Sequence, residues 1–307
     1  MCGLINIGNT CWGNSLLQVF AKIQPLRVWL RQHETIHHDE HCCLCYLAGD
    51  LRRLSTSVVN EPFAPRCMLN RAQWNAAYDD MRQQDANEAC ISLLHACDNV
   101  DQDVLTLLSN DVKELRTASA KHATPFCMIF SGRQRTDTHC TACSTTRQVF
   151  EVFSMLQVPI PDEERPSVES ALARYIGLDR LASDDKCQFL KTDRAPCGAI
   201  GCRSTQTSVE WWPTVLTIGI KRFDNRLQKI SKPVSLQLTL AATSGITYDL
   251  RGVVVHHGES LNVGHYGAYV CGLDSKWFYC SDELQPRHVP VADVLSAQAY
   301  LLFYEKR

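Results

Sequence analysis

Apolar residues recur at three- and four-residue steps close to the start of the chain, at Leu16, Leu17, Phe20, Ala21 and Ile23. This spacing predicts an amphipathic helix that ends before Pro25. The polar residues from Asn6 to Thr10 predict a tight turn that leads into the helix. Cys11 therefore lies at the predicted helix N-terminus, where exposed backbone N–H groups and the helix dipole favour a thiolate. The alternative is an inert cysteine buried under a core helix.

Helical patterns dominate the first part of the chain, and strand patterns dominate the second. An amphipathic run covers Leu26–Gln32, and residues 46–110 look mostly helical. Near residue 122 the pattern changes to short β-like runs separated by turns. The predicted strands include Val149–Val158, Thr205–Trp211, Pro213–Phe223, Tyr248–His256, Trp277–Tyr279 and Ala299–Tyr304.

Composition narrows the class of protein. The chain has 307 residues, 45% of them apolar, which fits one large domain or a few packed lobes. Its 31 basic and 33 acidic residues are well mixed, so we expect it to bind neither nucleic acid nor an anionic membrane surface. The sequence has no apolar run long enough to cross a bilayer, and we expect no signal peptide, because its first residues lack a basic region followed by an apolar one. Its 16 cysteines then indicate zinc binding or catalysis in a reducing compartment, cytoplasmic and/or nuclear.

Two cysteine pairs predict a structural zinc site. Cys140 and Cys143 form a Cys-x2-Cys knuckle, and Cys197 and Cys202 form a second pair with wider spacing. Pairs of this kind, each placed before a strand, suit four-cysteine zinc that holds a thin β-ribbon together. Cys187 is a rival ligand for the second pair, and a metal-free ribbon with four thiols is the alternative.

A second group of metal-ligand residues lies between His33 and Cys45. Cys42 and Cys45 have Cys-x2-Cys spacing, and four histidines precede them, at His33, His37, His38 and His41. Because only one such cysteine pair is present here, the sequence leaves a second zinc site and a polar surface loop both open.

Two further segments carry candidate chemistry. Asp85 and Glu88 have capping-box spacing, and the cap uses one oxygen of Asp85 and leaves the other free. His265 opens a predicted strand, and Asp282 follows 17 residues later. A thiolate nucleophile needs an imidazole partner, and the imidazole needs an acceptor that fixes its tautomer, so we expect Cys11, His265 and Asp282 to act together. His265 as an ordinary residue at a strand edge is the alternative.

These segments together resemble the ubiquitin-specific proteases over essentially the whole chain. The cysteine motif reads Asn-Thr-Cys-aromatic-x-Asn-Ser-x-Leu-Gln within residues 3–20, and Gln-x-Asp-Ala-x-Glu follows at residues 83–88. Pro-x-x-Leu-x-Ile-x-x-Lys-Arg-Phe covers residues 213–223, and Gly-His-Tyr-x-x-Tyr begins at Gly264. The resemblance implies an α+β fold, a papain-like cysteine protease built as a single catalytic domain over residues 1–307. Within it, a helical thumb would cover about 1–122, zinc-bound β fingers about 126–212 and a β-sheet palm about 213–307.

The resemblance also implies an activity: a monomeric, thiol-dependent enzyme that hydrolyses isopeptide or peptide bonds after the C-terminal Gly-Gly of ubiquitin. Cys11 would attack the carbonyl, His265 would protonate the leaving amine, and the Asn6 amide would donate to the oxyanion. Zn²⁺ would be structural, with no cofactor for catalysis. The implied substrate-binding residues are Gln84, Asp85, Gly264 and Tyr266.

Ser281 is the main departure from the family pattern, because it occupies the position of the usual Asn or Asp of the triad. We expect the neighbouring Asp282 to serve instead. One alternative function is a protease for another ubiquitin-like modifier with the same tail; another is a catalytically weak pseudoprotease that binds such modifiers. A chain that begins two residues before the cysteine motif is also what a trimmed catalytic core would look like.

Overall fold

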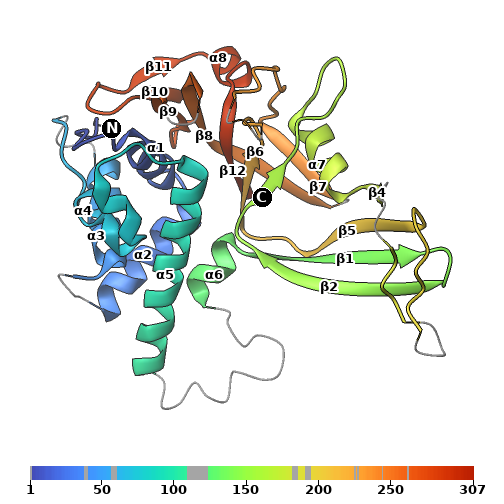
Figure 1. The fold of residues 1–307 in the computed structure, drawn as a ribbon. Helices are drawn as coiled ribbons and strands as arrows, with labels where there is room; N and C mark the ends of the chain where they lie inside the picture. The colour runs from blue at the N-terminus through green and yellow to red at the C-terminus, as the bar shows by residue number, and fades with distance from the viewer. Residues whose placement is uncertain are drawn as a thin grey trace.

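The structure is a computed structural model, in which a helical lobe is followed by a narrow sheet and a large sheet, with one strand of the large sheet placed between strands of the narrow one along the chain (Figure 1). The expected boundary near residue 122 lies outside the part of the chain that is described. The described residues are 2–37, 41–56, 61–108, 124–181, 186–190, 195–224, 226, 228–243, 245–260 and 263–307.

The helical lobe surrounds its first helix. The described helices of this lobe are α1 (Cys11–Phe20), α2 (Gln24–Ile36), α3 (Cys43–Ser55), α4 (Arg66–Leu69), η1 (Arg71–Gln73), η2 (Ala76–Asp80), α5 (Ala86–Leu108) and α6 (Pro125–Phe130). All 10 residues of α1 are buried. Pro25 stands in the first turn of α2, so the proline that closes the first apolar run also begins the next helix.

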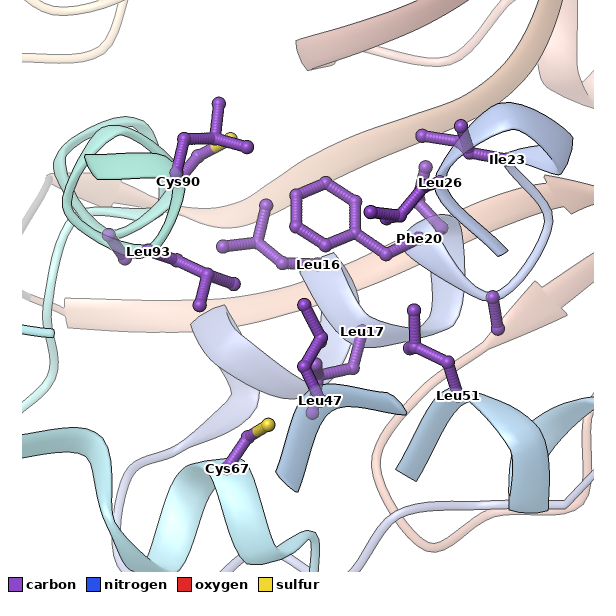
Figure 2. Packing of buried hydrophobic residues seen from close by; sticks show 14 of the residues in the cluster. Leu16, Leu17, Phe20, Ile23, Leu26, Leu47, Leu51, Cys67, Cys90 and Leu93 are labelled. Carbon is purple, nitrogen blue, oxygen red and sulfur yellow. The ribbon is translucent and has the colours of Figure 1, made fainter. Parts of the chain in front are cut away.

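Apolar side chains of α1 form the centre of the core in this lobe. Figure 2 shows Leu16, Leu17 and Phe20 between side chains of α2, α3 and α5. The Phe20 ring also packs against Phe130 of α6 and Phe303 of the large sheet, with ring centroids 5.7 and 5.6 Å away. The first helix is thereby fixed against both the other helices and the sheet, which gives Cys11 at its N-terminus a rigid support.

The narrow sheet extends away from the other two parts (Figure 1). Its order is β2-β1-β5-β4, and each neighbouring pair is antiparallel. The strands are β1 (Gly132–Cys140), β2 (Thr145–Phe153), β4 (Leu178–Leu181) and β5 (Arg203–Trp211). Most of β2 is exposed, so this sheet buries little apolar surface of its own. The pattern of apolar residues did not predict β1, whose central residues are polar on both faces.

The large sheet has the order β11-β10-β9-β8-β12-β6-β3, with β7 paired to β8. Its strands are β3 (Leu156–Val158), β6 (Val215–Ile220), β7 (Thr239–Thr243), β8 (Ile246–Ser260), β9 (Val263–Cys271), β10 (Trp277–Cys280), β11 (Arg287–Val289) and β12 (Ala299–Lys306). The short helices α7 (Val168–Ile176) and α8 (Val291–Leu295) complete the described elements. Alternate residues of β8 enter two cores, with Val254 on the side of α1 and Val253 on the other.

This architecture brings two distant parts of the sequence together. The face of the large sheet formed by β8 and β9 packs on α1, which places the start of that helix beside the histidine-bearing end of β9. Every helix in the described part of the chain is too short or too polar to span a bilayer.

Candidate active site

Cys11 is the first residue of α1, and only 4% of its surface is exposed. Burial raises the pKa of its thiol above the ordinary value of 9.0, and the nearby charge of Asp282 raises it further. Backbone N–H groups of Tyr266, Trp12 and Cys11 itself oppose this shift by hydrogen bonding to the sulfur. The Tyr266 donor comes from β9, so helix and sheet both contribute to the sulfur environment. The resting thiol is neutral near neutral pH.

The turn before Cys11 fixes the orientation of the Asn6 side chain. Asn6 Oδ1 accepts from the backbone N–H groups of Gly8, at 3.2 Å, and Thr10, at 3.0 Å. Gly8 and Asn9 adopt positive φ angles of 109° and 52°, which residues of these types tolerate best. Because Oδ1 is fixed as an acceptor, Nδ2 must face the other way, where it donates to Asp282 Oδ2 at 2.8 Å. Its second hydrogen is available to another acceptor.

His265 lies near the start of β9, opposite His257 of β8. Its Nε2 atom lies 2.8 Å from the hydroxyl oxygen of Ser281, which follows the end of β10. Its Nδ1 atom lies 3.9 Å from Asp282 Oδ2. The hydrogen bonds of the described residues include none between the Cys11 thiol and the His265 ring.

Asp282 joins the two ends of the chain. Its two carboxylate oxygens accept from the side-chain amides of Asn6, at 2.8 Å, and Asn14, at 2.9 Å. Its carbonyl oxygen accepts from the backbone N–H of Leu4 at 2.7 Å, and its φ angle is +42°. The hydroxyl of Ser281 therefore makes the closer contact with the imidazole, whereas the carboxylate of Asp282 holds the turn and α1. The expected role of Asp282 as the acceptor for His265 stays a prediction.

Three participants in this arrangement were not assigned a role from sequence. Asn14 belongs to the cysteine motif, but its spacing of three residues from Cys11 does not reveal that it reaches Asp282. Ser281 was identified only as a departure from the family pattern. The backbone N–H of Tyr266 has no signal in the sequence, because any residue except proline carries the same group.

The residues expected to bind substrate have different environments. Asp85 caps α5 through a 2.6 Å bond from the Asn87 N–H to Oδ1, as predicted. The expectation that its second oxygen is free is wrong, because the Tyr300 hydroxyl donates to Oδ2 at 2.7 Å. Burial raises the pKa of the Asp85 carboxyl, and these donors counteract the shift. Gln84 is partly exposed and donates to Asp80 Oδ1 at 3.0 Å.

Gly264 and Tyr266 lie on either side of His265. A Cβ at Gly264 would stand 2.4 Å from both the His256 imidazole and the His257 carbonyl oxygen, so the backbone approach allows only glycine. The carbonyl of Gly264 accepts from Gln83 Nε2 at 3.1 Å, which connects β9 to the segment before α5. The Tyr266 ring is buried, with its centroid 4.6 Å from that of His256. The Tyr266 ring therefore packs in the core, while its backbone N–H donates to the Cys11 sulfur.

The cysteines of the narrow sheet gather at its far end. The sulfur atoms of Cys140, Cys143, Cys187 and Cys197 all lie within 4.8 Å of one another. Four thiols are the donor set of structural zinc, so these residues fit the ion. The predicted set had Cys202 in place of Cys187. Cys202 is nevertheless adjacent, because its sulfur lies 3.3 Å from that of Cys140.

Backbone pairing explains why Cys187 enters this group. Residues 186–190 and 196–200 pair through two antiparallel bridges, Lys186 with Ile200 and Leu190 with Pro196. The N–H of Gly198 also donates to the carbonyl of Cys187 at 2.9 Å. This pairing folds Cys187 back onto Cys197. The nine residues between them do not match a zinc-knuckle spacing, so this pairing could not be predicted from the spacing of the cysteines.

Comparisons with known proteins agree with this geometry. Over 323 residues the chain is 29% identical to ubiquitin carboxyl-terminal hydrolase 19 of Arabidopsis thaliana, covering 99% of this chain and 46% of that protein. It is 27% identical to human ubiquitin carboxyl-terminal hydrolase 42, covering 98% of this chain and 22% of that protein. The chain thus spans less than half the length of these curated relatives.

Solved structures share the fold. The SAGA Ubp8/Sgf11/Sus1/Sgf73 DUB module bound to ubiquitin aldehyde contains a chain that matches with a TM-score of 0.80. The identity is 20%, and the match covers 100% of this chain and 70% of that one. At that identity the likeness establishes the fold alone, and it confirms the expected papain-like α+β architecture. The family model described as "Ubiquitin carboxyl-terminal hydrolase" matches residues 2–304, nearly the whole chain. The chain therefore belongs to the ubiquitin carboxyl-terminal hydrolase family.

Proposed function

We propose that this chain is a thiol-dependent deubiquitinase that hydrolyses the peptide or isopeptide bond after the C-terminal Gly-Gly of ubiquitin. The observation that supports the proposal is that Asn6, His265 and Cys11 all lie near one carboxylate, that of Asp282: Asn6 donates to it, His265 Nδ1 lies 3.9 Å from it, and its charge acts on the Cys11 thiol. Family membership supports the same activity. Two of the similar solved structures contain ubiquitin aldehyde or monoubiquitin, which is consistent with ubiquitin as the partner.

The proposed reaction begins at the Cys11 sulfur. His265 Nδ1 takes the thiol proton as the sulfur attacks the carbonyl carbon of the terminal glycine. The tetrahedral intermediate then collapses, and the imidazolium gives its proton to the departing lysine amine. A thioester between Cys11 and ubiquitin remains. His265 next removes a proton from water, which attacks the thioester, and the thiol and a free ubiquitin carboxylate are released.

Asn6 is the proposed oxyanion donor. Its Oδ1 is occupied by backbone N–H groups, and one Nδ2 hydrogen is bonded to Asp282. The other Nδ2 hydrogen is the group that would donate to the oxyanion as negative charge develops there. Because the donor is already oriented, no reorganisation accompanies the reaction, and such a donor typically contributes about a hundredfold or more in turnover.

Ser281 and Asp282 divide the task of the third triad residue in this proposal. The Nε2–H of His265 donates to Ser281 Oγ, which leaves the lone pair of Nδ1 for the thiol proton. Asp282 holds Asn6 and stabilises the imidazolium by its charge from 3.9 Å. This division argues against a pseudoprotease, because the serine that departs from the family pattern makes a well-formed contact with the histidine.

The remaining parts of the proposal concern substrate and environment. The helical lobe, narrow sheet and large sheet serve as thumb, fingers and palm, with Gln84 and Asp85 at the thumb side of the ubiquitin tail. Gly264 and Tyr266 flank His265 on β9 and are the proposed contacts of the Gly-Gly tail beside the catalytic residues. Zn²⁺ held by the finger cysteines would close the tip of the narrow sheet, whose own core is small. A catalytic thiol and a four-thiolate site both persist in the reducing cytoplasm or nucleus.

The proposal is tested by capture with ubiquitin that carries a thiol-reactive electrophile at its C-terminus, read by intact mass and peptide mapping. We expect one adduct, located on Cys11, and none in Cys11→Ala. The same electrophile on other ubiquitin-like modifiers with the Leu-Arg-Leu-Arg-Gly-Gly tail tests the alternative substrate. Faster capture of such a modifier than of ubiquitin would assign the chain to that modifier. Failure of every probe with a folded sample would refute the protease assignment.

A further inference from the structure

We propose that Tyr279 and His257 are positioning residues, which orient and polarise the catalytic histidine through the hydroxyl of Ser281. Together with His265 they form a hydrogen-bond network that starts at the His265 imidazole and ends on β8. This role rests on the proposed function, because it concerns what His265 needs while it takes up the thiol proton. It adds two side chains to the residues that the cysteine and histidine motifs supply.

Three contacts make up the network. His265 Nε2 lies 2.8 Å from Ser281 Oγ. Burial raises the pKa of the Tyr279 phenol above its ordinary value of 10.0, and a hydrogen bond with Ser281 opposes that shift. The Tyr279 hydroxyl oxygen lies 3.0 Å from Nε2 of His257, which is exposed at the surface. The network therefore connects β9, the end of β10 and β8.

The backbone of β9 leaves room for the Tyr279 side chain to cross it. Because β9 lies between β8 and β10, Tyr279 has to pass over β9 to reach His257. A Cβ at Gly267 of β9 would stand 2.4 Å from the Tyr279 hydroxyl oxygen, so a larger residue there would displace that hydroxyl. The Tyr269 ring, at a centroid distance of 4.9 Å, and the Arg287 guanidinium, 5.3 Å from the ring centroid, hold the Tyr279 ring in place.

Donors and acceptors in the network follow one consistent direction. Nδ1 of His265 takes the thiol proton in the proposed reaction, so Nε2 carries a hydrogen and donates to Ser281 Oγ. The Ser281 hydroxyl then donates to Tyr279, and Tyr279 donates to Nε2 of His257. This last acceptor must be a neutral imidazole. Desolvation, together with the positive charges of His265 and Lys229, lowers the pKa of His257 below its ordinary value of 6.5, so its ring is neutral near neutral pH.

This direction makes Ser281 a better partner for the histidine than a serine is by itself. Hydrogen bonds that run head to tail polarise one another, so Ser281 Oγ accepts more strongly when its own hydrogen is donated to Tyr279. Positive charge develops on His265 as it takes the thiol proton, and a stronger acceptor at Nε2 supports that charge. No proton moves along the network. Tyr279 and His257 thereby offset part of the charge that Ser281 lacks relative to an aspartate.

Turnover of a fluorogenic ubiquitin amide by the full chain tests this role. Tyr279→Phe keeps the ring and removes only the hydroxyl, so we expect kcat to fall about three- to tenfold with KM unchanged. His257→Leu should lower kcat by a similar factor. The double variant should lose no more than either single variant, because both substitutions interrupt the same network. Tyr269→Phe is the matched control, since Tyr269 packs on the Tyr279 ring while its hydroxyl is outside the network, and it should preserve kcat.

NMR of the free protein with isotope-labelled histidines tests the network without relying on cleavage. In the wild type, the Nε2–H proton of His265 should give a downfield signal that exchanges slowly with water. In Tyr279→Phe that signal should move upfield and exchange faster, an effect that loss of packing elsewhere would not produce.

Two results would overturn the positioning role and leave the proposed function standing: a Tyr279→Phe variant with the kcat of an active wild type, or losses in the two single variants that add in the double variant. An unchanged His265 signal in Tyr279→Phe would overturn the role as well. Failure of the wild type to cleave any ubiquitin substrate would instead refute the proposed function, and the NMR comparison would still decide whether the network orients His265.

Discussion

Replacing Asp282 with asparagine removes one acceptor oxygen from the side chain that joins Asn6 to Asn14. In the native chain each carboxylate oxygen accepts one amide hydrogen bond, at 2.8 and 2.9 Å. Asparagine at position 282 has a single acceptor oxygen and an NH2 group in place of the other. The side-chain amide of either Asn6 or Asn14 would then face this NH2 donor in place of an acceptor. Both hydrogen bonds involve a charged acceptor in a mostly buried position, where each contributes about 1.5–3 kcal/mol.

We therefore expect the free energy of unfolding of Asp282→Asn to fall by about 1.5–3 kcal/mol. Turnover should fall as well, by up to about a hundredfold, because Asn6 loses the contact that orients its oxyanion-donating amide. The reactivity of the Cys11 thiol should change in the opposite sense to turnover. The charge of Asp282 raises that pKa, so its removal lowers it and speeds alkylation of Cys11 near neutral pH.

Chemical denaturation, iodoacetamide kinetics and turnover of a fluorogenic ubiquitin amide measure these three quantities. Ser281→Ala is the matched comparison, since its hydroxyl contacts His265 and neither amide. It should lower turnover while leaving the free energy of unfolding near that of the wild type. A slower alkylation rate in Asp282→Asn, together with unchanged stability, would show that Asp282 acts through the histidine and would refute this reasoning.

Three further predictions follow from packing and burial. Gly264→Ala should lower turnover at least tenfold, because its Cβ would lie 2.4 Å from the His256 imidazole. Gly49→Ala is the control, because a Cβ there would have nothing within 4 Å; it should preserve turnover and raise the free energy of unfolding by about 0.5–1 kcal/mol. Phe20→Ala should cost about 3–5 kcal/mol in chemical denaturation, since its ring is fully buried, and a loss below about 1 kcal/mol would contradict the packing described. Alkylation of Cys11 by iodoacetamide should keep accelerating above pH 9, because burial raises the pKa of the resting thiol above 9.0; a plateau well below that pH would contradict the neutral thiol.

Local patterns predicted the elements that position the site. The three- and four-residue spacing of Leu16, Leu17 and Phe20 identified α1, and the alternation through Ile218 identified β6. These predictions succeeded because the apolar residues recur with the period of a helix in α1 and of a strand in β6, even though every residue of both elements is buried. The family and the fold were recognised from the motifs around Cys11 and His265, and both are confirmed.

These local patterns could not predict contacts between residues that lie far apart in the sequence. The capping spacing of Asp85 says nothing about Tyr300, whose hydroxyl arrives from β12 at the other end of the chain. The pairing of Cys187 with Cys197 depends on two β-bridges between irregular segments rather than on spacing. The separate roles of Ser281 and Asp282 could not be predicted from sequence either. Which of the two side chains faces His265 depends on the direction of the backbone at Asp282, which has a positive φ angle.

Cleavage of isopeptide-linked di-ubiquitin by the wild type and by Cys11→Ala tests the central claim most directly. Removing the sulfur of a residue that is 4% exposed should leave the fold and the metal content intact. We predict that the wild type releases monoubiquitin and that the folded Cys11→Ala variant releases none. Equal cleavage by both proteins, or no cleavage by a folded, zinc-loaded wild type, would contradict the assignment of Cys11 as the nucleophile of a deubiquitinase.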